Sequence, residues 1–191
     1  MLTLTFRQQL AIGFCLVLLM ALTRSHHWAN LHFLPDATWA VFFLVGVYLR
    51  PLWIAPALML GAAFIDFAAI TWGGISDFCV SPAYGFLIPA YFALFLAGRA
   101  YARHHRLSWS ALPWLAGCAL AGAVGAELFS SGGFYFFSGQ FAEPSLGEFI
   151  PRMVKYFPHM LSTMASYLGL AAAIHVAAAF WLGNTRHAAR P

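Results

Sequence analysis

Apolar residues form six long runs along the chain, and the short stretches between them hold most of the charged, glycine and proline residues. Runs of this kind predict membrane-spanning helices, because about 20 apolar residues cover the hydrocarbon core of a bilayer. The second run is short for a crossing, and the sixth is too long for one straight crossing at about 1.5 Å per residue. We predict helices at residues 8–23, 36–49, 51–72, 83–102, 108–129 and 150–182.

Two features of the runs predict departures from straight helices. Pro56 and Pro113 fall inside the third and fifth predicted helices, which predicts kinks near residues 52 and 109. The connection between the fifth and sixth helices reads SSGGFYFFSGQFAEPSLGEF. Because it is long and rich in glycine, it predicts a mobile lid over one end of the bundle.

Composition supports an all-α integral membrane protein with six transmembrane helices and a single domain, residues 1–191. The chain is 62% hydrophobic and 8% charged, whereas a soluble domain has about 25% charged residues. No polar linker divides it. The net charge of +4 does not indicate nucleic-acid binding, because the basic residues are scattered at the ends of the predicted helices. The lipid bilayer is therefore the first expected partner.

The distribution of basic residues predicts the orientation. Six spans place the two termini on one side of the membrane, and the excess of Lys and Arg marks the cytoplasmic side. Three basic residues fall on the opposite side, Arg24, Arg152 and Lys155. We therefore predict cytoplasmic termini, with the 1–2, 3–4 and 5–6 connections facing outward. Seven arginines fall on the side of the termini, namely Arg7, Arg50, Arg99, Arg103, Arg106, Arg186 and Arg190.

Two acidic residues lie within the apolar runs. Asp66 stands near the middle of the third, and an ionisable group there marks either a functional site or a buried polar contact between helices. Glu127 lies near the outer end of the fifth run, where an acid is expected to reach the interface.

Cys79 lies in the outer 3–4 connection, GGISDFCVSP, beside Asp77. No Lys, Arg or His occurs between residues 51 and 98, so no neighbour in sequence lowers the pKa of this thiol as a nucleophile requires. A metal ion deprotonates a coordinating thiol by itself. A lone cysteine suits one axial position on a metal whose other ligands come from a cofactor, although a plain free thiol remains the simpler interpretation.

The histidines and aromatic residues leave alternatives open. His26 or His27 with Cys79 would form a small metal site, but at a spacing unlike known motifs. His104 and His105 lie among arginines and are expected to be solvated. Several aromatic residues gather at predicted outer ends, among them Trp72, Phe78, Tyr84 and the residues 134–137. They are typical of an interfacial aromatic belt, or of the wall of a cavity for a large, partly apolar ligand.

The chain resembles a known family in three segments, LPDATWAVFFLVGVYLRP, FIDFAAI and GGISDFCVSPAYGFLIPAY. They are similar to the BtuM family of small vitamin B12 transporters of Gram-negative bacteria, which is related to the S-components of energy-coupling-factor transporters. The resemblance implies an S-component-like bundle in the bacterial cytoplasmic (inner) membrane. It also implies uptake of cobalamin from the outer side, with Cys79 as axial ligand of the cobalt and possible removal of cyanide from cyanocobalamin.

The resemblance implies binding roles for further residues as well. Asp66 and Tyr84 would hydrogen-bond the corrinoid or orient the loop, and His27 and Phe78 would lie on the same rim. S-components present an Ala-x-x-x-Ala pattern on the first helix to a shared energising module. The pattern is absent here, because the residue four positions after Ala11 is Cys15. No nucleotide-binding loop is present. The alternatives are a membrane enzyme with Cys79 as nucleophile, or an S-component-like carrier of another vitamin or metal ion.

Overall fold

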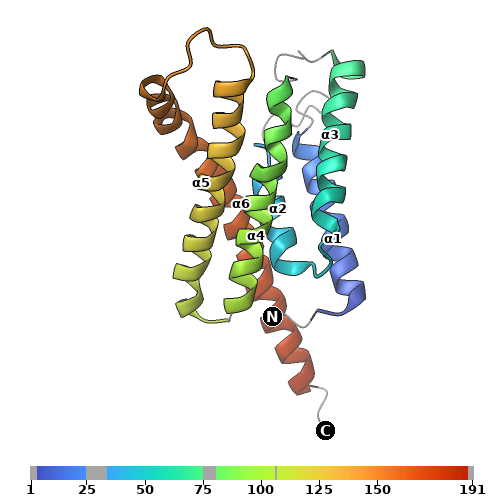
Figure 1. Ribbon diagram of the computed structural model, residues 1–191. Helices are drawn as coiled ribbons and strands as arrows, with labels where there is room; N and C mark the ends of the chain where they lie inside the picture. Colours follow the sequence, from blue (N-terminus) through green and yellow to red (C-terminus); the bar gives the residue numbers. More distant parts are fainter. Residues whose placement is uncertain (1–3, 25–33, 75–80, 106, 189–191) are drawn as a thin grey trace.

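The computed structural model describes residues 4–24, 34–74, 81–105 and 107–188, with only the helical backbone for 182–188. All regular structure in these residues is helical (Figure 1). The elements are α1 (Phe6–Arg24), α2 (Thr38–Tyr48), α3 (Ile54–Gly73), the 3₁₀ helix η1 (Pro82–Phe86), α4 (Leu87–His104), the 3₁₀ helix η2 (Trp109–Ala111), α5 (Leu112–Phe137) and α6 (Leu146–Ala188).

The predicted all-α membrane fold is confirmed in its main features. Five helical stretches of the described chain are long and apolar enough to cross a membrane. The exception is α2, whose 11 residues span about 16 Å, well short of a bilayer core. Every predicted helix has a counterpart, although the fifth and sixth extend beyond their predicted ends.

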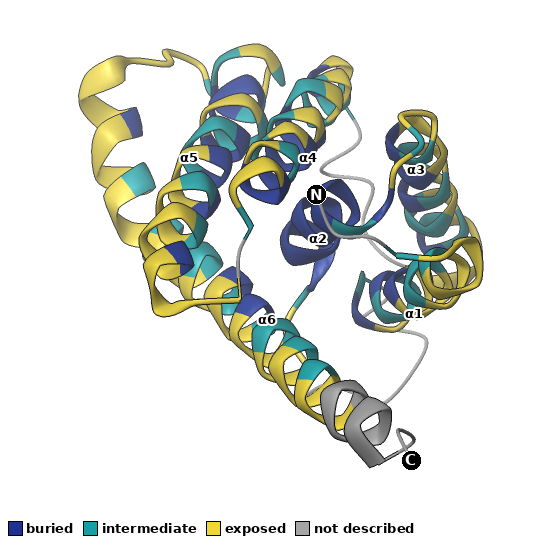
Figure 2. Cartoon of the chain, turned by 90° about the horizontal axis from the view of Figure 1, so that it is seen from below, coloured by how far each residue is buried: buried dark blue, intermediate teal, exposed yellow. Residues whose placement is uncertain are grey.

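The short helix α2 forms the centre of the bundle. Figure 2 shows it enclosed by α1, α3, α4 and α6, with its surface buried all round. Ten of its residues are buried, which explains why its sequence, TWAVFFLVGVY, has no polar face. Phe42 is fully buried and stacks on Tyr91 of α4, with ring centroids 4.4 Å apart.

Glycines let α2 and α4 approach closely. A Cβ atom built on Gly98 of α4 would overlap the carbonyl oxygen of Phe43, and one on Gly46 of α2 would overlap the carbonyl oxygen of Phe95. Small residues at a crossing let helix backbones come together, which matters in a membrane because lipid is as apolar as the side chains. This crossing holds α2 in the core.

The structure corrects two predictions about irregular segments: the kinks in the third and fifth helices, and the length of the loop between the fifth and sixth. Pro56 and Pro113 lie in the first turns of α3 and α5. Backbone N–H groups in a first turn have no partner within the helix, so a proline there removes no helix hydrogen bond and neither proline kinks a helix interior. The predicted lid is mostly helical, because α5 continues to Phe137 and α6 begins at Leu146. Tyr135 is buried and its ring stacks on Phe149, which explains why these aromatic residues fold onto α6 instead of forming a loop.

The longest helix, α6, contains Pro151 and Pro158. Figure 1 shows its first turns at an angle to the rest of the helix, as expected where proline interrupts the backbone hydrogen bonds. Most of its described side chains are exposed.

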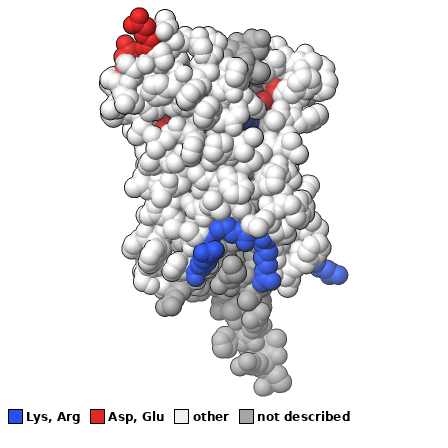
Figure 3. Space-filling model, viewed as in Figure 1, with Lys and Arg blue, Asp and Glu red and all other residues white. Residues whose placement is uncertain are grey.

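Charged residues separate along the bundle. In Figure 3, Lys and Arg gather at the end where α1 begins and α6 ends, and acidic residues lie toward the opposite end. Arg7, Arg50, Arg99 and Arg103 lie at the first of these ends, by their positions at the start of α1, after α2 and near the end of α4. We call it the basic end, and the other the acidic end. This separation of charge agrees with the excess of arginines predicted on the side of the termini. The direction of the bundle in a membrane remains a prediction.

Candidate functional site

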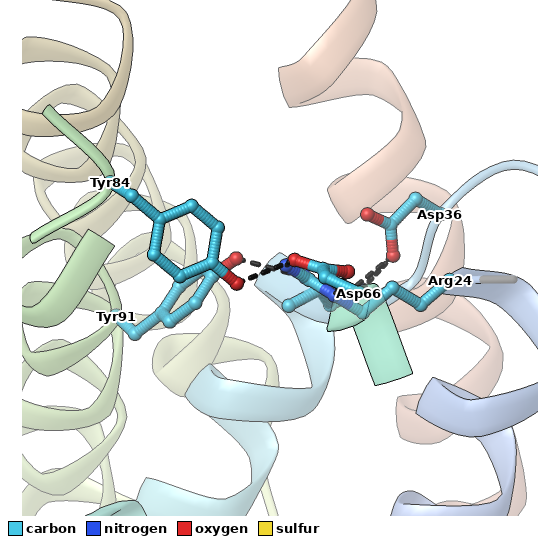
Figure 4. A network of polar contacts seen from close by, with 6 residues as sticks. Arg24, Asp36, Asp66, Tyr84 and Tyr91 are labelled. Atoms are coloured by element: carbon cyan, nitrogen blue, oxygen red, sulfur yellow. Dashed lines mark hydrogen bonds and ion pairs between the residues drawn. The ribbon is translucent and has the colours of Figure 1, made fainter. Parts of the chain in front are cut away.

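A network of polar side chains lies at the acidic end, where α1, α3 and α4 approach the start of α2. Asp66 of α3 is at its centre (Figure 4). Around it are Arg24, the last residue of α1, Tyr84 of η1 and Tyr91 of α4. We call this set the Asp66 network. It joins segments that are up to 67 positions apart in the sequence.

The strongest contact in the Asp66 network is a two-pronged ion pair. The Nε of Arg24 donates to Oδ1 of Asp66 at 2.7 Å, and its Nη2 donates to Oδ2 at 2.6 Å. The side chains are 9% and 26% exposed, respectively. Paired N–H groups match the geometry of a carboxylate, and this pairing compensates two charges that would be costly in an apolar bundle.

The structure shows the polar contact between helices that was one of the two interpretations of Asp66, and its functional role stays a prediction. Its partner was missed. Arg24 was interpreted as a marker of topology, because it follows the apolar run of α1 and no local pattern connects it with residue 66. A lone acid within one apolar helix and a lone base at the end of another are the only signals that could have suggested the pair.

Two tyrosine hydroxyl groups complete the surroundings of the ion pair. Tyr84 donates to Oδ2 of Asp66 at 2.6 Å. Tyr91 accepts a hydrogen bond from Nη1 of Arg24 at 2.9 Å, and Thr38 accepts another at 3.2 Å. Tyr84 was predicted from the sequence to bind the ligand or orient the loop, and its bond to Asp66 favours the second role. Tyr91 was not predicted, because an aromatic residue in an apolar helix carries no distinguishing signal.

The start of α2 is tied to the same region. The backbone N–H of Thr38 donates to Oδ1 of Asp36 at 2.8 Å, and the Thr38 hydroxyl donates to the same oxygen. The N–H of Ala37 donates to the hydroxyl of Thr23 at 3.1 Å. These bonds satisfy backbone and side-chain groups at the buried beginning of the helix. Through Thr38, the core helix is hydrogen-bonded directly to Arg24.

The segment that carries Cys79 is flanked by α3 and η1, the elements that supply Asp66 and Tyr84. Gly74 follows α3 with φ of 68°, a left-handed conformation that glycine adopts without strain. Pro82 opens η1, and the N–H of Tyr84 donates to the carbonyl of Ser81 at 2.8 Å. The predicted site residues Cys79, Phe78 and His27 lie outside the described residues.

Other predicted candidates lie apart from this site. Glu127 is 3% exposed, so the expectation that it reaches the interface is wrong; it faces inward from α5. His105 was expected to be solvated but is half-buried, with its Nδ1 3.0 Å from the Tyr101 hydroxyl. His104 is exposed as expected, and its ring stacks on Trp114. Within the described parts of the chain, no group of three or more His, Cys, Asp or Glu side chains could hold a metal ion.

No family model matches the chain, and no curated protein matches it. Support for a function therefore comes from the residues of this chain and from the geometry of the Asp66 network.

Proposed function

We propose that this protein takes up cobalamin across the bacterial cytoplasmic membrane and binds the corrinoid from the outer side. The observation that carries the proposal is the hydrogen bond between Tyr84 and Asp66. It links the second half of α3 to η1, and these are the two elements that flank Cys79 in the sequence. Holding together the two elements that flank a loop limits the positions open to the side chains between them.

A cobalt corrinoid needs only one further donor from the protein, because the corrin supplies four equatorial nitrogens. In this proposal the Cys79 thiolate is that axial donor, and soft sulfur is a suitable ligand for a transition metal. Arg24 supplies a cation on the same side of the bundle, but Asp66 neutralises it. The cobalt itself is therefore the group that favours the ionised thiol.

Asp66 and Tyr84 act as positioning residues in this proposal. Arg24 occupies both oxygens of the Asp66 carboxylate, and Tyr84 occupies one of them as well. The carboxylate therefore has little remaining capacity for a ligand. In this proposal, cyanide removal is a ligand exchange. Cyanide departs with the electron pair of its bond to Co(III) and the thiolate provides a new pair, so cobalt is not reduced.

The absorption spectrum of bound aquocobalamin tests the axial-ligand role. We expect the purified protein to shift this spectrum, because sulfur coordination changes the electronic transitions of the corrin. The Cys79→Ala variant should leave the spectrum of added aquocobalamin unshifted, and Cys118→Ala, a control at a partly buried cysteine of α5, should behave as the wild type. A full shift in Cys79→Ala would exclude cysteine ligation.

The positioning role has a separate readout. Tyr84→Phe removes one hydrogen bond to a charged group and should weaken cobalamin binding about tenfold, while the spectral shift at saturation is retained. A lost shift at saturation would instead make Tyr84 part of the ligand sphere. Growth on limiting cobalamin, in cells that lack their own uptake system, then tests transport.

The same preparation discriminates the alternative functions. Rapid labelling of Cys79 by thiol reagents at neutral pH, without any corrinoid, would favour a cysteine nucleophile. Absence of cobalamin binding would favour a carrier of another vitamin or of a metal ion.

A further inference from the structure

A second feature lies at the basic end, far from the Asp66 network along the bundle. A cavity of about 340 Å³ opens between α2, α4, η2, α5 and α6. Its volume is within the range of small-molecule sites in proteins, about 300–1,000 Å³. Most of its lining is aliphatic or aromatic, including Phe43, Leu168 and Phe180. We call it the α6 cavity.

The α6 cavity follows the direction of the helices. Its lining on α6 extends from Leu168 to Phe180, which at 1.5 Å per residue corresponds to about 18 Å. One leaflet of a bilayer has a hydrocarbon depth of about 15 Å, half of the whole core. The cavity therefore has the length of one lipid acyl chain that reaches from the interface toward the middle of the membrane.

Polar groups line the α6 cavity close to the ends of the helices. The Tyr48 hydroxyl lies 3.3 Å from Nδ1 of His175, and the Tyr101 hydroxyl lies 3.0 Å from Nδ1 of His105. The two histidine rings meet edge to face, with centroids 5.0 Å apart. Polar and apolar lining together would suit an amphipathic ligand better than a purely apolar one.

A second cavity, of about 320 Å³, adjoins the first through Ala111, which lines both. Arg103, His104 and Ser110 supply its polar lining, and Trp114 lies beside them. No Asp or Glu among the described residues lines either cavity. This basic cavity is therefore complementary to an anion, and basic pockets between helices at the cytoplasmic side are typical sites for anionic lipid head groups.

We propose that the α6 cavity holds one acyl chain of an anionic phospholipid from the surrounding leaflet, with the lipid phosphate at Arg103 and His104. The occupant follows from three features: a leaflet-deep apolar channel, a polar end, and an adjoining basic cavity. The lipid would fill the space that α6 leaves beside the core and would couple this helix to α4. The proposal does not depend on cobalamin binding.

Native mass spectrometry of the full-length protein with added phosphatidylglycerol or phosphatidylcholine tests this site. Ala172 lines the cavity, whereas its exposed neighbour Ala173 does not. We expect Ala172→Trp to lower phosphatidylglycerol retention at least tenfold, because the indole fills the channel, and Ala173→Trp to retain lipid as the wild type. Equal retention by the two variants would overturn the proposal.

A surface pair tests the head-group contact without altering the packing. Arg103→Gln removes an exposed cation from the basic cavity, and Arg7→Gln removes an exposed cation at the same end that lines neither cavity. Arg103→Gln should weaken phosphatidylglycerol binding about fivefold and leave phosphatidylcholine binding unchanged, while Arg7→Gln should change neither. Equal affinity of the wild type for the two lipids, or equal effects of the two variants, would contradict the assigned head-group site.

Discussion

The helices α2 and α6 show opposite solutions to packing within one bundle. α2 has 11 residues, too few to cross a membrane, yet ten of them are buried. α6 has 43 residues and most of its described side chains are exposed. The shorter helix forms the core, and the longer one faces the surroundings of the protein.

The difference shows that hydrophobicity does not indicate burial in a membrane protein. Lipid tails are as apolar as leucine, so helices associate through close packing and hydrogen bonds. α2 has both, through the glycine crossing with α4 and the bond from Arg24 to Thr38. α6 packs less closely along its second half, and the α6 cavity is the result.

The largest effect is expected from truncating a phenylalanine in each helix. Phe42 is fully buried in α2, whereas Phe180 of α6 is 67% exposed. Phe42→Ala should lower the free energy of unfolding by about 3 kcal/mol, because it leaves a cavity and removes the stacking on Tyr91. Phe180→Ala should cost less than about 1 kcal/mol. Reversible unfolding in mixed micelles measures both, and equal losses would refute the assignment of α2 as the core.

A matched pair of glycine substitutions gives the next largest effect. A Cβ on Gly98 would overlap the backbone of Phe43, whereas one on Gly169 of α6 meets open space. Gly98→Ala should therefore destabilise the protein by about 2 kcal/mol through overpacking, since backbone atoms must move. Gly169→Ala should stabilise it by about 0.5–1 kcal/mol through helix propensity.

The same unfolding measurement applies to this pair. A stabilising effect of Gly98→Ala would mean that α2 and α4 do not cross at these glycines. A destabilising effect of Gly169→Ala would mean that α6 has a close neighbour at this position.

Helix positions could be predicted from the sequence because apolar runs and their ends are local properties. The αL glycine at Gly74 and the helix-starting proline at Pro82 were predictable for the same reason. The helical structure of residues 130–137 could not be predicted, because their glycines suggested a loop. The aromatic packing that accompanies the helix there involves α6, which is a separate segment of the sequence. The glycine crossing of α2 and α4 also depends on residues far apart in the chain.

The candidate site was only half predictable. Asp66 and Tyr84 could be singled out, since an acid in an apolar helix is costly and Tyr84 lies at a predicted outer end close to Cys79 in the sequence. Arg24 and Tyr91 could not, because their roles depend on contacts across 42 and 67 positions of sequence. A carboxylate indicates that a partner exists, but local sequence does not say which helix supplies it.

The smallest predicted effect concerns the basic end, where α4 meets α6 across His105. Burial lowers the pKa of His105 below its usual value of 6.5, and the nearby His175 lowers it further. The unfolded chain therefore binds a proton at His105 more readily than the folded protein does. As the pH falls through about 6.5, this difference reduces the stability of the folded state.

We therefore expect the free energy of unfolding to decrease between pH 7 and pH 5.5, and to decrease less in His105→Gln. His104→Gln removes an exposed imidazole that stacks on Trp114 instead of contacting His175, so it should keep the wild-type dependence on pH. Unfolding measured at both pH values distinguishes the two variants. Identical pH dependence in wild type and His105→Gln would mean that His105 is as solvated in the folded protein as in the unfolded chain. In that case α6 would not cover the end of α4, and its packing at the basic end would be looser still than the α6 cavity indicates.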